Sequence, residues 1–242
     1  MNNMQIIEGK GVTKHFGGLA AVVNVDFHIN QGEIVGLIGP NGAGKTTFFN
    51  LISGALTTTA GVIRFKGENI TGLKPHQICK RRVARTFQSV KVFFNMTALE
   101  NVLLGSLFGA STGTCMPDAK AEAMELLEFV GLSAKKGNLA KDLTIANQKR
   151  VEVARALATK PELLLLDEVM AGLNPTEVAQ VIELVKKIRD KGITVFMIEH
   201  VMKAIMEISD RIIVLHHGEK IAEGTPEEIA TSQEVITVYL GK

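Results

Sequence analysis

The residues EIVGLIGPNGAGKTTFFNLISG, from Glu33 to Gly54, hold three patterns in succession. The nearly continuous apolar run up to Gly39 is typical of a strand that is covered on both faces. The loop GPNGAGKT follows, and after it TTFFNLISG favours a helix that ends at Gly54. A strand, a glycine-rich loop and a helix in this order predict a mostly parallel α/β fold that binds its ligand where strands end.

The loop from Gly39 to Thr46 matches the pattern G-x-x-x-x-G-K-[ST] in the structural setting that this pattern requires. Gly42 and Gly44 let the backbone curl so that successive N–H groups point inward. The following helix adds its positive end, Lys45 brings a charge to the β- and γ-phosphates, and the Thr46 hydroxyl can ligate Mg²⁺. A chance glycine-rich turn is the alternative, and the strand–loop–helix order argues against it.

A second chemical motif lies in PELLLLDE, where Asp167 and Glu168 follow a buried apolar run. The C-terminal ends of parallel strands form the ligand-binding edge of such a sheet. Asp167 is suited to hold Mg²⁺ through water, and Glu168 to polarise an attacking water molecule. A carboxylate pair that only caps the next helix is the alternative, and a phosphate loop in the same chain makes it less favourable.

The remaining pattern predicts an α/β core interrupted by a helical insertion. The middle of the chain, from Thr97 to Leu157, is helical in character, with GASTGTCMPD (109–118) as a connection inside it. Strand and helix signals then alternate again. The other expected strands are 21–29, a strand and turn in GVIRFKGENIT, 193–200 and the segment from residue 211, and the other expected helices are 175–191 and 202–209.

Composition restricts the class of protein. Of 242 residues, 46% are hydrophobic and 21% charged, which is typical of a globular chain. The net charge of +2 gives no case for nucleic-acid binding, and the short cluster KRRVAR (80–85) is interpreted as a solvated face. Cys79 and Cys115 fit neither a disulfide framework nor a zinc site and suit a reducing compartment. No signal-peptide pattern and no apolar run of about 20 residues occurs, so any membrane association is expected to come through a partner.

With these motifs, the chain resembles the ATP-binding subunits of ABC transporters over essentially its whole length. The resemblance implies a P-loop NTPase (RecA-like) parallel-sheet core with an antiparallel β subdomain and an inserted α-helical subdomain. It implies one nucleotide-binding domain, 1–242, in which 1–88 and 158–242 form the core with its β subdomain and 89–157 form the helical subdomain. ATP and Mg²⁺ are the implied cofactors.

The resemblance also assigns residues. Gln88, in RTFQ, matches the Q-loop glutamine; His200, in MIEH, matches the switch histidine; and AGLNP (171–175) matches the D-loop. The implied catalytic residues are Glu168, His200 and Gln88, and the implied metal ligands are Thr46, Gln88 and Asp167. The implied nucleotide-binding residues of the same chain are Phe16, which would stack on adenine, Gly39, Asn41, Gly42, Ala43, Gly44, Lys45, Thr46 and Thr47. Without the resemblance, His200 reads as a loop histidine and Phe16 as a core residue, and the other five histidines are interpreted as structural or solvated.

The stretch LTIANQKRVEVARAL (143–157) resembles the ABC signature, usually L-S-G-G-Q, which in the family caps the ATP of the opposite subunit. Thr144, Ala146 and Asn147 are therefore implied to bind the partner's nucleotide. Ala146 replaces the usual glycine, so its methyl group would crowd a close approach to phosphate and resist any positive φ.

The implied partners are transmembrane permease subunits, a second ABC ATPase subunit in a homo- or heterodimer, and, indirectly, a periplasmic or extracellular substrate-binding protein; no nucleic acid is expected. The chain would lie peripherally on the cytoplasmic face of the cell membrane. Phe93, Phe94 and Met96 either belong to the core or line a groove for a permease helix.

RTFQ, AGLNP and the closing residues resemble the ATPase of branched-chain amino-acid importers, which makes uptake of such amino acids the expected function. VYLG also occurs in export ATPases of the lipopolysaccharide type. An exporter ATPase, a soluble non-transport ABC protein, a P-loop kinase and a subunit with little hydrolysis of its own are the alternatives.

Overall fold

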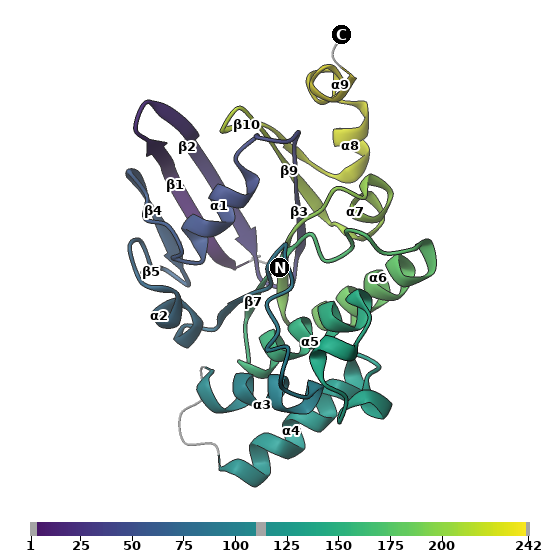
Figure 1. Ribbon diagram of the computed structural model, residues 1–242. Helices are drawn as coiled ribbons and strands as arrows, with labels where there is room; N and C mark the ends of the chain where they lie inside the picture. Colours follow the sequence, from purple (N-terminus) through teal and green to yellow (C-terminus); the bar gives the residue numbers. More distant parts are fainter. Residues whose placement is uncertain (1–3, 110–114, 241–242) are drawn as a thin grey trace.

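The computed structural model describes residues 4–109 and 115–240, and these residues are arranged around two sheets (Figure 1). The larger sheet has the strand order β10-β9-β3-β8-β7-β6. β3 pairs in parallel with β8 and β9, β7 pairs in parallel with β6 and β8, and β10 is antiparallel to β9. The bounds are β3 (Ile34–Ile38), β6 (Val83–Arg85), β7 (Leu163–Asp167), β8 (Thr194–Ile198), β9 (Arg211–His216) and β10 (Glu219–Gly224).

The central strands of this sheet are buried along their whole length. Every residue of β3, β7 and β8 is buried, as expected for short apolar strands that are covered on both faces. Because these strands are parallel, their carboxyl ends meet at one edge of the sheet. That edge carries the loop from residue 39, the pair Asp167 and Glu168, and residues 199 and 200.

The smaller sheet is antiparallel, with the order β2-β1-β4-β5. Its strands are β1 (Gln5–Phe16), β2 (Leu19–Asn30), β4 (Ala60–Phe65) and β5 (Glu68–Asn69). The sequence pattern did not predict β1, because its pairing with β2 shifts register four times and its alternation is therefore broken. A Cβ atom at Gly9 would lie 2.1 Å from the Phe27 ring, so β1 can cross this aromatic side chain only with glycine at that position.

Helix α1 (Lys45–Ile52) lies between the two sheets (Figure 1). Its Phe48 ring packs edge-on against Phe27 of β2, at 4.8 Å between centroids, and against Phe196 of β8, at 6.3 Å. Such edge-to-face aromatic contacts each add about 0.5–1.5 kcal/mol beyond the burial of area. The helix that begins at the phosphate loop is therefore held from two sides.

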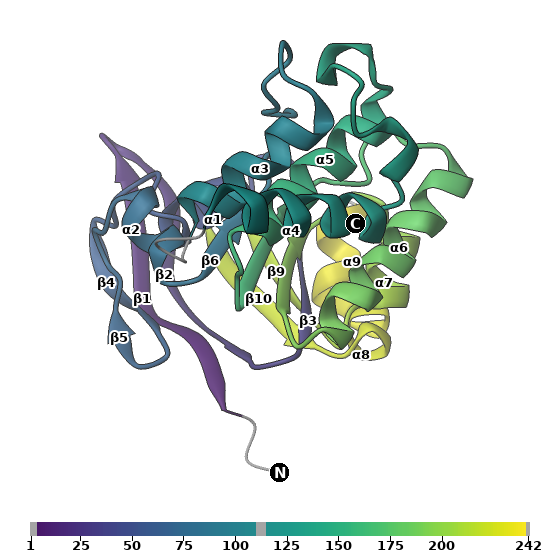
Figure 2. The same cartoon turned by 90° about the horizontal axis from the view of Figure 1, so that it is seen from below.

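A group of three helices, α3 (Ala98–Phe108), α4 (Met116–Phe129) and α5 (Ile145–Ala158), packs together (Figure 2). Two 3-10 turns, η1 (Ser133–Lys135) and η2 (Ala140–Asp142), connect α4 to α5. Thr97 begins α3 with a reciprocal cap, since its hydroxyl accepts from Glu100 N while the Glu100 carboxylate accepts from Thr97 N. The apolar positions expected to face the core in α5 (Val151, Ala154 and Leu157) are all buried.

The other helices complete the covering of the larger sheet. They are α2 (Pro75–Lys80), α6 (Pro175–Asp190), α7 (Met202–Ile208), α8 (Pro226–Thr231) and α9 (Gln233–Leu240). The expected helices 175–191 and 202–209 agree with α6 and α7. Residues 110–114 of the expected connection 109–118, and Gly241 and Lys242 of the closing segment, lie outside the described residues. Among the described helices, none combines the length and the apolar character needed to cross a bilayer.

Candidate active site

The loop between β3 and α1 has the backbone that its glycines predict. Gly42 and Gly44 have φ values of 79° and 99°, in the left-handed region that glycine favours. A Cβ atom at Gly44 would lie 2.4 Å from the backbone oxygen of Ala21, so the loop packs too closely there for any side chain. α1 starts directly after Gly44 and directs its unpaired N–H groups and positive end toward the loop.

Lys45 holds its ammonium group inside this loop. Its Nζ donates to Gly39 O at 2.7 Å and to Pro40 O at 3.0 Å, and the side chain is buried. Burial lowers the pKa of Lys45, while the nearby carboxylates of Glu168 and Asp167 act in the opposite direction. The cation is thus close to both carboxylates and is satisfied by carbonyl oxygens that an anion in the loop can replace.

A cavity of about 490 Å³ opens over the loop. Its size falls within the range of small-molecule pockets, about 300–1,000 Å³. Phe16 lies at this cavity with its ring 5.1 Å from Lys14 Nζ. The wall also includes His217, for which the sequence predicts only a structural or solvated role. The lining residues are Phe16, Leu19, Ala20, Ala21, Asn41, Gly42, Ala43, Gly44, Lys45, Thr46, Thr47, Gln88, Glu168, His200 and His217.

Three residues that lie far apart in the sequence meet at one carboxylate. Gln88 Nε2 donates to Glu168 Oε2 at 2.9 Å, and His200 Nε2 lies 2.8 Å from Glu168 Oε1. A carboxylate only accepts hydrogen bonds, so the second bond requires the histidine proton on Nε2. The structure therefore brings the three expected catalytic side chains into one hydrogen-bonded group on the cavity wall.

Asp167 is buried beside this group and pairs with Arg85. Arg85 Nη2 donates to Asp167 Oδ2 at 2.7 Å, while its Nη1 donates to Asn50 Oδ1 at 2.6 Å and Ser53 Oγ at 3.0 Å. Burial raises the pKa of Asp167, and the bond and charge of Arg85 oppose this shift. The expectation that KRRVAR forms a solvated face is wrong for Arg85, because β6 runs beside β7 and brings this side chain to the buried carboxylate.

The donor set fits a nucleotide with Mg²⁺. Among the described residues, Asp167 Oδ1 is buried and has no hydrogen-bond partner, which leaves an oxygen lone pair for a metal-bound water molecule. Mg²⁺ prefers oxygen ligands and keeps several waters, so one carboxylate, one hydroxyl and phosphate oxygens are a sufficient set. Thr46 and Gln88, the other expected metal ligands, line the cavity, and Asp167 does not.

The signature-like stretch lies away from this cavity. Thr144 caps α5, with its hydroxyl accepting from Asn147 N at 3.4 Å, and Gln148 Nε2 donates to Ala140 O and Leu143 O. Thr144, Ala146 and Asn147 do not line the cavity of their own chain. Ala146 lies inside the helix, where φ is negative, so the expected conflict between its side chain and a positive φ does not arise.

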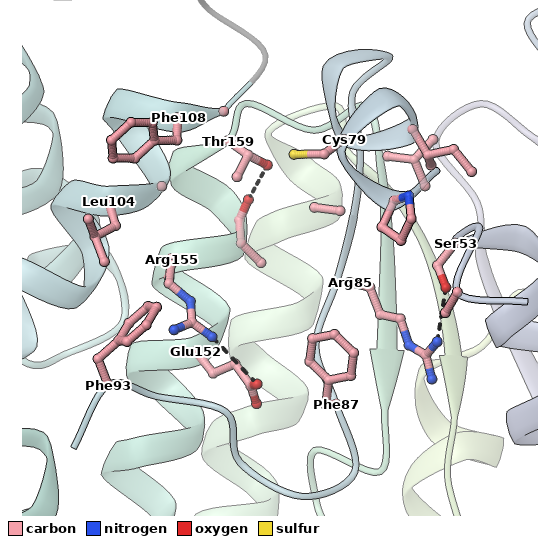
Figure 3. Close-up of a pocket in the computed structure, with 18 residues that line it drawn as sticks. Ser53, Cys79, Arg85, Phe87, Phe93, Leu104, Phe108, Glu152, Arg155 and Thr159 are labelled. Carbon is pink, nitrogen blue, oxygen red and sulfur yellow. Dashed lines mark hydrogen bonds and ion pairs between the residues drawn. The ribbon is translucent and has the colours of Figure 1, made fainter. Parts of the chain in front are cut away.

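A second hollow, of about 590 Å³, is mostly apolar and lies between the α3–α5 helices and the β6 edge of the core (Figure 3). Phe87, Phe93 and Phe108 lie on its wall, with the ion pair of Glu152 and Arg155 between them. Phe93 thus lines a groove, as one of its two interpretations predicted. Phe94 and Met96 are not among the lining residues.

Comparison with known proteins finds, for most of the chain, the same family that the sequence motifs resemble. A family model described as "ABC transporter" matches residues 22–171, and one described as "Branched-chain amino acid ATP-binding cassette transporter" matches residues 219–242. The high-affinity branched-chain amino acid transport ATP-binding protein BraF of Pseudomonas aeruginosa is 42% identical, over 98% of both chains. The lipopolysaccharide export system ATP-binding protein LptB of Haemophilus influenzae is 32% identical, over 99% of this chain and 98% of its own.

Solved structures agree. An ATP-binding cassette of an ABC transporter in its ADP conformation superposes with a TM-score of 0.89, at 30% identity, over 99% of this chain and 100% of that chain. A dimeric ATP-binding cassette in a post-hydrolysis state, bound to ADP and phosphate, gives a TM-score of 0.83 at 28% identity, over 91% of this chain and 98% of that chain.

Proposed function

The chain belongs to the ATP-binding subunits of ABC transporters, and from this membership we propose that it hydrolyses ATP to energise the uptake of branched-chain amino acids. The observation that carries the hydrolytic part is the group formed by Gln88, Glu168 and His200 on the wall of the phosphate-loop cavity. The 42% identity to BraF along nearly the full length supports the choice of substrate class.

In this proposal the phosphate loop binds the nucleotide and Lys45 neutralises its terminal phosphates. The backbone N–H groups of the loop and the start of α1 are oriented before the nucleotide arrives, so little reorganisation is needed. Phe16 stacks on the adenine ring from the cavity rim. The remaining loop residues, Gly39 to Thr47, shape the cradle around the phosphates.

Glu168 acts on the attacking water. Its carboxylate is held by Gln88 on one oxygen and by His200 on the other, which fixes its direction toward the cavity. A carboxylate held in this way accepts a proton from water as the nucleophile forms. The Nε2 proton of His200 points to Glu168 before the nucleotide binds, so the ring must turn to donate this proton toward developing negative charge on the γ-phosphate. Mg²⁺, when bound, supplies positive charge at the β- and γ-phosphate oxygens. Thr46, Gln88 and, through water, Asp167 would hold it.

A second ATPase subunit completes the site. We propose that the first turn of α5, with the exposed Thr144, the buried Ala146 and the partly exposed Asn147, caps a nucleotide that the partner subunit holds. The partner's signature would in turn cap the nucleotide of this chain. The dimeric relative bound to ADP and phosphate supports such an assembly. The altered tip at Ala146 favours a heterodimer in which the partner carries the regular signature.

The permease docks in the apolar groove of Figure 3. We propose one occupant, a short cytoplasmic helix of the permease with apolar side chains that reach Phe87, Phe93 and Phe108. The groove adjoins Gln88 through Phe87, so the two sites share one segment of chain. Through the permease the chain is held at the cytoplasmic face of the membrane and acts on a substrate-binding protein only indirectly. The boundaries 1–88, 89–157 and 158–242 between core and helical subdomain stay a prediction.

Two experiments test these proposals. The complex of this chain with its partner subunits is purified from membranes and assayed for ATP hydrolysis with Mg²⁺, and Glu168→Gln is expected to keep nucleotide binding while turnover falls by about 10²-fold or more. Cells that lack the chain are assayed for uptake of labelled leucine, with complementation by wild type but not by Glu168→Gln. Normal leucine uptake together with impaired delivery of lipopolysaccharide to the cell surface would replace the importer with the export function of the LptB relative.

A further inference from the structure

The turn that follows β7 holds Glu168, which carries the catalytic carboxylate, in an unusual backbone conformation. Glu168 has φ of 52°, in the left-handed region that non-glycine residues seldom adopt. Its N–H donates to Ile198 O at 2.9 Å, and its carbonyl accepts from Ala171 N at 3.2 Å. A strained residue of this kind persists only where surrounding contacts over-determine it, and here two buried charged side chains provide such contacts.

Lys149 holds the carbonyl groups of this turn. The side chain leaves α5 and is 7% exposed, and its Nζ donates to Glu168 O at 2.9 Å and to Ala171 O at 2.7 Å. A buried ammonium requires partners, and here its bonds go to the main chain of the segment that carries the catalytic carboxylate. α5 is thereby tied directly to the edge of the larger sheet.

Glu199 holds an amide group of the same turn. It follows β8 and precedes His200, it is 1% exposed, and its Oε1 accepts from Met170 N at 2.8 Å. Among the described residues, Oε2 has no hydrogen-bond partner. Burial raises the pKa of Glu199 to about 7, against the backbone N–H groups of Met170 and His200 and the charge of Lys149.

The two side chains therefore hold the turn 168–171 by opposite groups. The cation binds its carbonyl oxygens and the carboxyl group binds its N–H, and the two residues come from different elements, α5 and the end of β8. We call this pair the Lys149–Glu199 clamp. Neither side chain lines the nucleotide cavity, so neither touches the phosphates or the water.

We propose that Lys149 and Glu199 are positioning residues for ATP hydrolysis, which fix the Glu168 main chain so that its carboxylate stays between Gln88 and His200. The proposal rests on the hydrolytic function proposed above. A shift of about 1 Å in a reacting group can lower a rate by about 10²-fold, so loss of the clamp acts on turnover more than on nucleotide binding.

The first experiment compares Lys149→Met, Lys149→Arg and the control Lys220→Met. Lys220 is a partly buried lysine of β10 that pairs with Glu223, away from the turn. Lys149→Met is expected to lower kcat by about tenfold or more, with KM and the number of nucleotides bound per chain close to wild type. Lys149→Arg regains part of the turnover, and Lys220→Met retains it.

The second arm concerns the carboxyl group. Glu199→Gln keeps an oxygen that accepts from Met170 N, so it is expected to keep turnover within about threefold of wild type, whereas Glu199→Ala loses about tenfold. If Lys149→Met fails to fold because it leaves Glu199 without its compensating charge, the double variant Lys149→Met/Glu199→Gln removes both charges and serves in its place.

The outcomes separate the inference from the function on which it rests. Turnover of Lys149→Met within about twofold of wild type overturns the clamp, and so does a loss of turnover that only follows a loss of bound nucleotide. If Glu168→Gln hydrolyses ATP as fast as wild type, the proposed function is overturned instead.

Discussion

Replacement of Arg85 by methionine should destabilise the nucleotide-free chain through the carboxylate that it leaves behind. The Arg85 and Asp167 side chains are 7% and 1% exposed and lie 2.7 Å apart. Removing one partner of a buried ion pair leaves an uncompensated charge and costs about 3–5 kcal/mol. Typical domains have a total stability of about 5–15 kcal/mol, so the effect is large.

The double variant Arg85→Met/Asp167→Asn distinguishes this cause from lost packing. With the carboxylate replaced by an amide, no buried charge is left, and we expect at least about 2 kcal/mol of the Arg85→Met loss to disappear. The loss in Arg85→Met alone should also shrink at low pH. Burial already raises the pKa of Asp167, removal of the guanidinium raises it further, and the protonated carboxyl no longer carries the charge.

The four proteins are wild type, Arg85→Met, Asp167→Asn and the double variant. Their unfolding in urea is measured without nucleotide or Mg²⁺, by far-UV circular dichroism because the chain has no tryptophan. The free energy of unfolding lost on Arg85→Met is compared between the chain with Asp167 and the chain with Asp167→Asn. Losses that agree within about 0.5 kcal/mol would show that the two side chains are not coupled and would refute the reasoning.

Four further predictions follow from particular contacts. Glu199, whose pKa of about 7 in the folded chain exceeds the ordinary 4.5, binds an extra proton on folding. The free energy of unfolding should therefore fall by up to roughly 3 kcal/mol as pH rises from about 4.5 to 7. Glu199→Gln should lack this pH dependence. A difference in urea midpoint between wild type and Glu199→Gln that is the same at pH 5 and at pH 8 would contradict the prediction. Gly44→Ala, with φ of 99° and a Cβ 2.4 Å from Ala21 O, should cost on the order of 1–3 kcal/mol in urea unfolding and abolish ATP binding, and unchanged affinity would count against the proposed cradle. Phe108→Ser, on the exposed wall of the groove, should leave ATP binding by the isolated chain unchanged and reduce recovery of the chain with the permease from membranes; full recovery would argue for another docking site. Ala146→Gly should raise turnover of the assembled complex if the altered signature tip limits it, and unchanged turnover would refute that limit.

Much of the core could be predicted from local pattern. The apolar runs at β3, β7 and β8 are buried at every position, as their composition indicated, and the phosphate loop has the backbone that its glycines require. The family was recognisable from the order of short motifs, and the comparisons confirm it. These features depend on residues adjacent in sequence, which is why the sequence reveals them.

The partners of the buried charges could not be predicted in this way. Arg85 meets Asp167 across 82 positions, and Lys149 meets Glu168 across 19. Such contacts depend on which strands and helices become neighbours, and local periodicity does not state that. One signal was present: Lys149 has Ala146 three residues before it and Val153 four residues after it on one helical face, so a lysine within an apolar stripe indicated a buried cation. β1 was missed because its glycines and register shifts break the alternation by which a strand is recognised.

The position of α1 between two sheets bears on how the molecule can work. Phe48 of α1 packs against Phe27 of one sheet and Phe196 of the other, and this close packing on both sides restricts movement of the helix. The start of α1, which faces the phosphates, is therefore preorganised before ATP arrives. We therefore expect the movement during a transport cycle to occur in the opposite wall of the cavity, which runs from Gln88 into the α3–α5 helices. The permease is proposed to bind to this same part of the chain.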